Sequence, residues 1–175
     1  MKKTFLLLFL FLFTACSKNI THNHNNALPI QILTQNKSPL VFNKILFAGG
    51  SLYDVKGGEV YLLSRILEQS PLSLILENQG SFLKAEAEYD YFTLNYEILA
   101  PQQKETFSKV IHFLLNYEIS EKEFVLAKNQ LWQELKQQED QFYDKVRLQF
   151  YKELYQNHRY ALPLSGTEKT IQNLT

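Results

Sequence analysis

Apolar positions at three- and four-residue spacing predict amphipathic helices in the middle of the chain. The first lies in residues 57–67, where two glycines end a turn before the helix. Its apolar face is formed by Val60, Leu63, Ile66 and Leu67. Ser70 and Pro71 interrupt this pattern, because proline cannot continue a helix from its interior.

The same spacing and the usual helix-start signals predict further helices downstream. They are expected at residues 72–78, at 101–117 after a proline, from 121 onward after a Ser-x-x-Glu capping box, and at the start of 167–175. Helical-spaced core candidates on the long helix that begins at residue 121 are Phe124, Leu131 and Leu135.

Alternating apolar and polar positions predict strands near residues 30–35, 41–48, 81–88 and 91–98. The turn-forming Asn36-Lys37-Ser38-Pro39 cluster between the first two indicates a β-hairpin. Together with the helices, the strands predict an α+β fold: a two-layer sandwich with a mostly antiparallel sheet that helices cover on one face.

The length and charge of the chain limit the kinds of protein that it can be. The 175 residues are 45% hydrophobic, which is enough to bury one sizeable core. The 18 basic and 18 acidic residues cancel, so a nucleic-acid partner is not expected.

The N-terminus has the features of a bacterial lipoprotein signal peptide at residues 1–15. Lys2 and Lys3 form a positive region, an apolar run follows, and small residues precede Cys16. Cys16 is the only cysteine, so an internal disulfide is excluded, and its position makes it the expected lipidation site.

Residues 16–27 are polar and predict a flexible tether between lipid and domain, with residues 28–175 as the folded part. His22 and His24 lie in the tether, and we interpret them as solvated linker residues. Ser17 after Cys16 resembles an outer-membrane sorting signal. The expected location is therefore the bacterial cell envelope, lipid-anchored in the outer membrane and facing the periplasm.

The run Gly57-Gly58-Glu59-Val60-Tyr61-Leu62-Leu63-Ser64-Arg65-Ile66-Leu67 resembles the motif helix of the pitrilysin/insulinase family of zinc peptidases, the inverzincins. That family has a His-x-x-Glu-His motif, in which two histidines bind zinc and the glutamate activates water. Here the three places hold Tyr61, Ser64 and Arg65. A guanidinium cannot ligate a metal, so the resemblance implies a degenerate motif, no catalytic residue and no bound zinc.

Downstream landmarks extend the resemblance over approximately residues 28–175. Residues similar to the family's are Tyr155-Gln156-Asn157, Pro163 and Gly166-Thr167-Glu168. Counted back from them, Glu134 falls at the position of the family's third zinc ligand. The resemblance thus implies that Glu134 is retained although its metal is lost.

Glu77-Asn78-Gln79-Gly80 is similar to the segment before the family's edge strand, to which a peptide substrate adds. The implied peptide-binding edge is Ser81, Phe82, Leu83, Lys84 and Ala85. The competing interpretation is a solvent-facing strand whose alternating charges at Lys84, Glu86 and Glu88 prevent aggregation.

The resemblance implies a catalytically inactive, lipid-anchored pseudo-peptidase that serves as a partner or peptide-binding subunit of an active homologous metallopeptidase. One alternative is a structural envelope lipoprotein or decayed gene fragment that handles no peptides. Another is an active enzyme with Tyr61 and Glu134 as ligands, although two oxygen ligands beside a cation make a poor zinc site. The chain covers only the front part of a family lobe, so a truncated gene, a split gene and a protein completed by a partner all stay open.

One local prediction follows from the lost metal. If the two helices pack as in the family, Glu134 points to the former zinc position, where a buried lone carboxylate is costly. Arg65 could then replace the ion by pairing with Glu134, while the Tyr61 hydroxyl donates to the same carboxylate. The alternative is that Arg65 turns to solvent and Glu134 is hydrated.

Overall fold

The structure, a computed structural model, describes residues 30–34, 38–138 and 142–175. The chain divides into two units, residues 1–38 and residues 39–175. The predicted signal peptide, Cys16 and the predicted tether lie outside the described residues. Within the described part, no helix is long and apolar enough to cross a membrane.

The second unit contains an antiparallel sheet of the strands β1 (Leu40–Ala48), β2 (Lys84–Ala87) and β3 (Tyr91–Leu99), in the order β1-β3-β2. Leu94 of β3 lies opposite Ile45 of β1 and Ala85 of β2. Three of the predicted strands are therefore present, and β2 is shorter than expected.

The predicted strand at residues 30–35 is wrong for residues 30–34, which have no regular structure. Ile30, Ile32 and Leu33 are 53%, 61% and 78% exposed, so the alternation in this segment buries no apolar face. The described residues 30–34 therefore supply no first strand for the expected hairpin, and the partner strand of β1 is β3, far along the chain.

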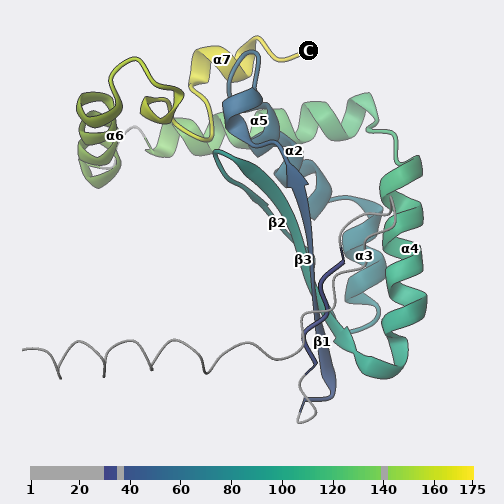
Figure 1. Cartoon of the computed structure of the whole chain (residues 1–175). Helices are drawn as coiled ribbons and strands as arrows, with labels where there is room; N and C mark the ends of the chain where they lie inside the picture. Colours follow the sequence, from purple (N-terminus) through teal and green to yellow (C-terminus); the bar gives the residue numbers. More distant parts are fainter. Residues whose placement is uncertain (1–29, 35–37, 139–141) are drawn as a thin grey trace, which may run out of the picture. The chain divides into compact units, whose positions relative to one another are not determined.

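The predicted helices are present, and α6 (Phe142–Tyr155) is a separate helix that was not predicted. They are α2 (Glu59–Glu68), α3 (Pro71–Glu77), α4 (Gln103–Asn116), α5 (Glu121–Gln138), α6 (Phe142–Tyr155) and α7 (Glu168–Gln172), with short 3-10 turns η1 (Ser51–Tyr53), η2 (Ala100–Gln102) and η3 (Arg159–Ala161). Figure 1 shows α3 and α4 side by side next to the sheet, and α5 crossing α2.

One face of the sheet is covered by α2, α3 and α4. Leu67, Leu72 and Val110 from these helices pack in one core with Leu94 and Tyr96 of β3. On the opposite face, Phe42 is 73% and Leu46 is 58% exposed. The α+β sandwich with helices on one face is therefore confirmed.

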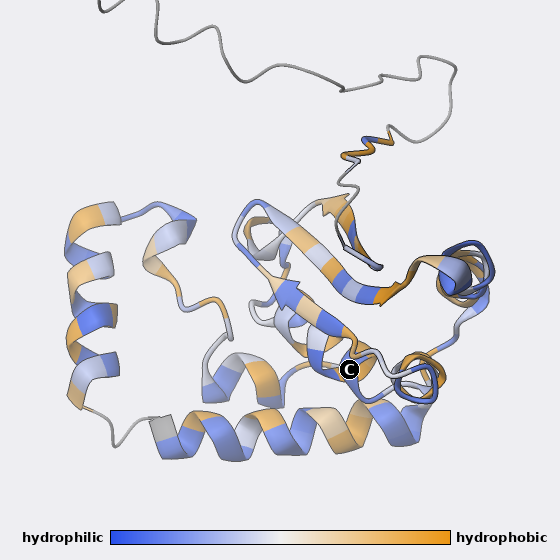
Figure 2. Cartoon of the chain, turned by 90° about the horizontal axis from the view of Figure 1, so that it is seen from below, coloured by the Kyte–Doolittle hydropathy of each residue, from blue (hydrophilic) through white to orange (hydrophobic). Residues whose placement is uncertain are grey.

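A second core connects α2 to α5 and α7. Leu62 and Ile66 of α2 pack there against Leu131 of α5 and Ile171 of α7. Apolar and polar residues alternate along α5, as Figure 2 shows. This packing brings the middle of α2 against α5, which places Arg65 next to Glu134.

Candidate functional site

The N-terminus of α2 is fixed by a buried carboxylate. Asp54, 4% exposed, accepts hydrogen bonds from the backbone N–H groups of Gly58, Glu59 and Val60 at 2.7, 3.0 and 3.1 Å. Burial raises the pKa of Asp54, although these three hydrogen bonds act in the opposite direction. Arg159 holds the same loop by donating to the carbonyls of Leu52 and Asp54.

The place of the family's catalytic glutamate holds a buried hydroxyl. Ser64 is 3% exposed, and its Oγ donates to the backbone carbonyl of Tyr61 at 2.7 Å. The only described hydrogen bond of the Ser64 side chain is therefore within α2. Ser64 also has no carboxylate that could activate a water.

The predicted pairing of Arg65 with Glu134 is confirmed. Arg65 Nη2 lies 2.9 Å from Glu134 Oε2 and donates a hydrogen bond to it. The expectation for Tyr61 was wrong in its partner: the hydroxyl oxygen accepts from the same Nη2 at 3.1 Å, instead of donating to Glu134. Because the charged guanidinium is the strongest donor within reach, the phenol oxygen serves as its acceptor.

The ion pair is only half-buried. The side chains of Arg65 and Glu134 are 35% and 42% exposed. Burial would lower the pKa of the Arg65 guanidinium, but Tyr61, Glu134 and Glu68 outweigh it and raise the pKa. Arg65 is therefore charged at every physiological pH.

These side chains do not fit the zinc ion of the resembled family. Glu134 is the one retained ligand. Of the other two ligand places, one offers the Tyr61 hydroxyl and the other holds Arg65, a permanent cation that pairs with Glu134. Among the described residues, no group of three His, Cys, Asp or Glu side chains could hold a metal.

The predicted peptide-binding edge is only partly a strand. Ser81, Phe82 and Leu83 precede β2, while Lys84 and Ala85 begin it. Phe82 is 75% exposed, and Lys84 pairs with Glu86 on the open face. β2 is nevertheless the outer strand of the sheet on this side, next to α2.

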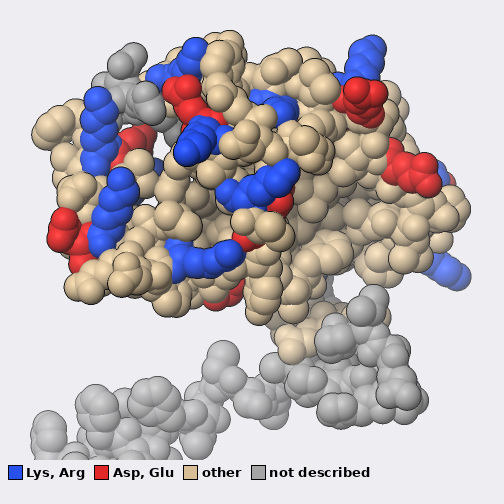
Figure 3. Space-filling view, turned by 90° about the horizontal axis from the view of Figure 1, so that it is seen from above, with Lys and Arg blue, Asp and Glu red and all other residues tan. Residues whose placement is uncertain are grey.

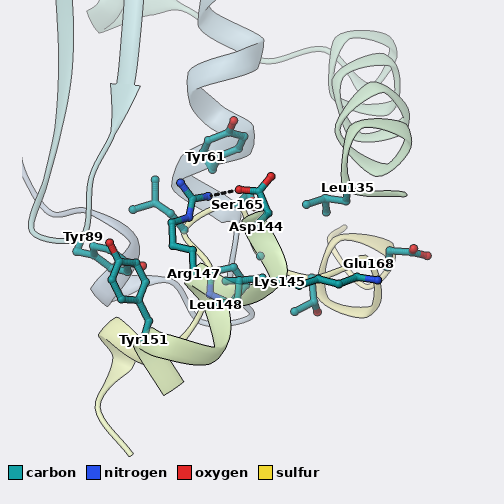
Figure 4. Close-up of a pocket in the computed structure, with 14 residues that line it drawn as sticks. Tyr61, Tyr89, Leu135, Asp144, Lys145, Arg147, Leu148, Tyr151, Ser165 and Glu168 are labelled. Carbon is teal, nitrogen blue, oxygen red and sulfur yellow. Dashed lines mark ion pairs between the residues drawn. The ribbon is translucent and has the colours of Figure 1, made fainter. Parts of the chain in front are cut away.

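A cavity of about 590 Å³ adjoins Tyr61 and was not predicted (Figure 4). It is lined by Tyr61, Tyr89, Leu135, Asp144, Lys145, Arg147, Leu148, Tyr151, Pro163, Leu164, Ser165, Gly166, Thr167 and Glu168. Arg147 points into it and pairs with Asp144 at 3.0 Å, which offsets its charge. No local motif signals this cavity, because its walls come from five separate segments.

Charge on the surface is mixed. Figure 3 shows Lys and Arg side chains close together on one face, with Asp and Glu side chains between them. This face is therefore not the continuous basic surface that nucleic acids bind.

Comparison with solved structures identifies the fold. An inactive M16 peptidase domain from Pseudomonas fluorescens superposes with a TM-score of 0.79 at 20% identity, covering 90% of this chain and 41% of that one. A protein described as an M16-like peptidase from Alicyclobacillus acidocaldarius gives 0.77 at 12% identity, covering 90% and 40%. A protease from Helicobacter pylori gives 0.73 at 17% identity, covering 79% and 36%.

The fold is that of a pitrilysin/insulinase-type (M16) half-domain. The resemblance predicted from the motif helix is thus confirmed at the level of the fold. The chain spans about two fifths of the length of these structures. No protein-family model matches the sequence, and no curated protein does.

Proposed function

We propose that this protein is a catalytically inactive, lipid-anchored relative of the M16 zinc peptidases that serves as a partner or peptide-binding subunit of an active metallopeptidase. The observation that carries the proposal is the Arg65–Glu134 ion pair. It replaces the metal by a fixed cation and satisfies the carboxylate that the metal would have neutralised.

The M16-type fold of this chain supports a binding role. The chain keeps an M16-type fold with α2 fixed by the Asp54 carboxylate and with β2 as an outer strand, while the places of the zinc-binding histidines and the catalytic glutamate hold Tyr61, Ser64 and Arg65. The M16 domain from Pseudomonas fluorescens has the same fold and is described as inactive. A fold maintained without its reactive groups retains its surfaces, and an outer strand is a ready surface for extended peptides.

Anchoring belongs to the proposal through Cys16. Several acyl chains at about 0.8 kcal/mol per buried methylene would hold the chain on a membrane. The proposed location is the envelope, with the half-domain facing the periplasm.

The test is purification of the tagged full chain from detergent-solubilised envelopes, followed by identification of co-purifying proteins. The matched control bait is residues 1–27 fused to an unrelated soluble domain, which shares the anchor but not the half-domain. A metallopeptidase with an intact His-x-x-Glu-His motif is expected with the full chain only. If neither a metallopeptidase nor any peptide is recovered, the structural-lipoprotein alternative is correct instead.

A further inference from the structure

The carboxylate of Glu68 lies between the motif helix and the outer strand. Its Oε1 accepts a hydrogen bond from the backbone N–H of Ala85 in β2 at 3.0 Å. Its Oε2 lies 3.9 Å from Nη1 of Arg65. One side-chain carboxylate therefore meets a backbone donor and a guanidinium at once, and it is 29% exposed there.

The backbone N–H of Ala85 is a hydrogen-bond donor on the outer edge of β2, where no other strand of the described sheet pairs. In an antiparallel pair, alternate residues direct their N–H and C=O groups to the partner strand and away from it. Ala85 lies opposite Leu94 of β3, yet its N–H donates to Glu68 on α2. This N–H is one that a peptide strand added along β2 would use, and Glu68 already occupies it.

Arg65 has donor capacity left at the same place. Its Nη2 serves both Glu134 and Tyr61, whereas Nη1 faces only the distant Glu68 oxygen among the contacts described. Its Nε is buried and has no hydrogen-bond partner within the described residues. The guanidinium can therefore donate hydrogen bonds to a second carboxylate while Nη2 keeps its hydrogen bond to Glu134.

We propose that the Ala85 N–H and the Arg65 guanidinium form a binding site for the carboxylate of an extended peptide. Without a peptide, the Glu68 side chain occupies this site. This inference rests on the proposed peptide-binding function and specifies its ligand. The incoming carboxylate is either a peptide C-terminus or an acidic side chain. It takes the place of the Glu68 carboxylate, and the rest of the peptide pairs with β2.

The native contact makes Glu68 a strong competitor. A carboxylate is a better acceptor for an N–H and a guanidinium than a neutral peptide carbonyl. Glu68 is also held on α2, which gives it a high effective concentration at the site. Ligands without a carboxylate should therefore fail to displace it, and ligands with one should bind weakly until Glu68 is removed.

The experiment compares the full chain in detergent with its Glu68→Ala and Glu68→Gln variants. Acetate and acetamide are titrated while the Ala85 amide and Arg65 Nε signals are followed by NMR. N-acetyl-Lys-Val-Thr-Val-Thr-Val is then titrated as the free acid, as the C-terminal amide, and as an amide with Glu in the last position. Glu118→Gln, in the exposed loop before α5, is the matched control. Thermal melting checks that each variant is folded.

In Glu68→Ala, acetate but not acetamide should shift the Ala85 and Arg65 signals, and the free acid should bind at least about tenfold tighter than to the native chain. Glu68→Gln should give a smaller gain, and Glu118→Gln none. The Glu-containing amide tells whether a side chain can replace the C-terminus.

Equal gains for acid and amide, with no response to acetate, would overturn the carboxylate site but leave peptide binding intact. No response of any variant to acetate or any peptide would overturn both this inference and the peptide-binding function.

Discussion

Arg65 carries a permanent positive charge at a place surrounded by acceptors: the Glu134 carboxylate, the Tyr61 hydroxyl and the more distant Glu68. A neutral residue here would leave Glu134 without its cation. Because both side chains of the pair remain over one-third exposed, the pair is a partly hydrated ion pair, and it contributes less than a fully buried one would.

Arg65→Ala and Glu134→Ala should therefore show a modest coupling. A well-buried pair predicts a cost on the order of 3 kcal/mol for Arg65→Ala alone, but the observed exposure lowers the expected coupling free energy to about 0.5–1.5 kcal/mol. Urea unfolding of the two single variants and the double variant measures it. A control cycle pairs Arg65→Ala with Glu121→Ala and should show no coupling, because Glu121 is exposed at the opposite end of α5 and has no described contact with Arg65.

The pairing was predictable because two separate stretches of sequence could be aligned with the family. The motif helix placed Arg65, and the downstream landmarks placed Glu134, at ligand positions of the same zinc site. The hydrogen-bond partner of Tyr61 and the hydrogen bond between Glu68 and Ala85 could not be predicted. They depend on side-chain directions around one helix turn, and several acceptors there compete for the same donors. The cavity beside Tyr61 was missed for a related reason, since segments up to about 100 residues apart build it.

Among the elements, α2 depends most on its entry turn. Gly57 and Gly58 have positive φ angles of 91° and 88°, and the Asp54 carboxylate accepts from the N–H groups that follow. A Cβ on Gly58 would lie 2.7 Å from the Ser165 carbonyl oxygen and 2.6 Å from Ile171 Cδ1. The turn therefore also fixes how the segment before α7 packs on α2.

Gly58→Ala should destabilise the protein more than Gly80→Ala. Both residues have positive φ, which costs a non-glycine residue roughly 1–2 kcal/mol, but a Cβ on Gly80 meets nothing within 4 Å. The backbone collision at Gly58 should add a further loss of about 1–3 kcal/mol. Chemical denaturation of both variants decides this, and equal losses would mean that the 165–171 segment does not pack on α2.

The start of α5 gives a pH-dependent prediction. Ser120 and Glu123 form the predicted capping box: Ser120 N–H donates to Glu123 at 2.9 Å, and Glu123 N–H donates to Ser120 Oγ at 3.3 Å. Hydrogen bonds from the Ser120 side chain and backbone lower the pKa of Glu123 below 4.5. A lowered carboxylate pKa stabilises the fold above the unfolded-state pKa, and this contribution is lost as the pH falls through the folded-state value.

Ser120→Ala should therefore lower the urea midpoint at pH 7 and have a smaller effect at an acidic pH below the lowered pKa of Glu123, where its carboxylate is protonated in the folded protein as well. Unfolding curves at both pH values test this. An effect of equal size at the two values would show that the Glu123 charge contributes nothing to the cap.

Strong local signals explain which elements were predictable. Proline, glycine and capping residues mark the helices, and nine-residue alternating runs mark β1 and β3. The segment at residues 30–34 has the same alternation over fewer residues, but a strand forms only where a partner and a core accept it. That condition is a property of the tertiary structure and cannot be read from the segment.

At the scale of the whole molecule, the chain has an M16 half-domain fold with β2 as an outer strand, and its motif helix carries Tyr61, Ser64 and Arg65 in place of the family's His-x-x-Glu-His residues. Both proposals depend on this combination. The proposed function takes the reaction to be absent without the zinc ligands, and the further inference takes β2 and the Arg65 guanidinium to bind a peptide once Glu68 has moved.

The central claim is that a guanidinium replaces the metal, and the metal content of the purified full chain tests it most directly. The chain is incubated with excess zinc, desalted, and analysed by elemental mass spectrometry, with an active M16 peptidase treated identically as the positive control. A peptide library assayed with and without chelator accompanies the measurement. The account predicts no stoichiometric zinc and no chelator-sensitive cleavage. One retained zinc per chain together with chelator-sensitive cleavage would contradict it.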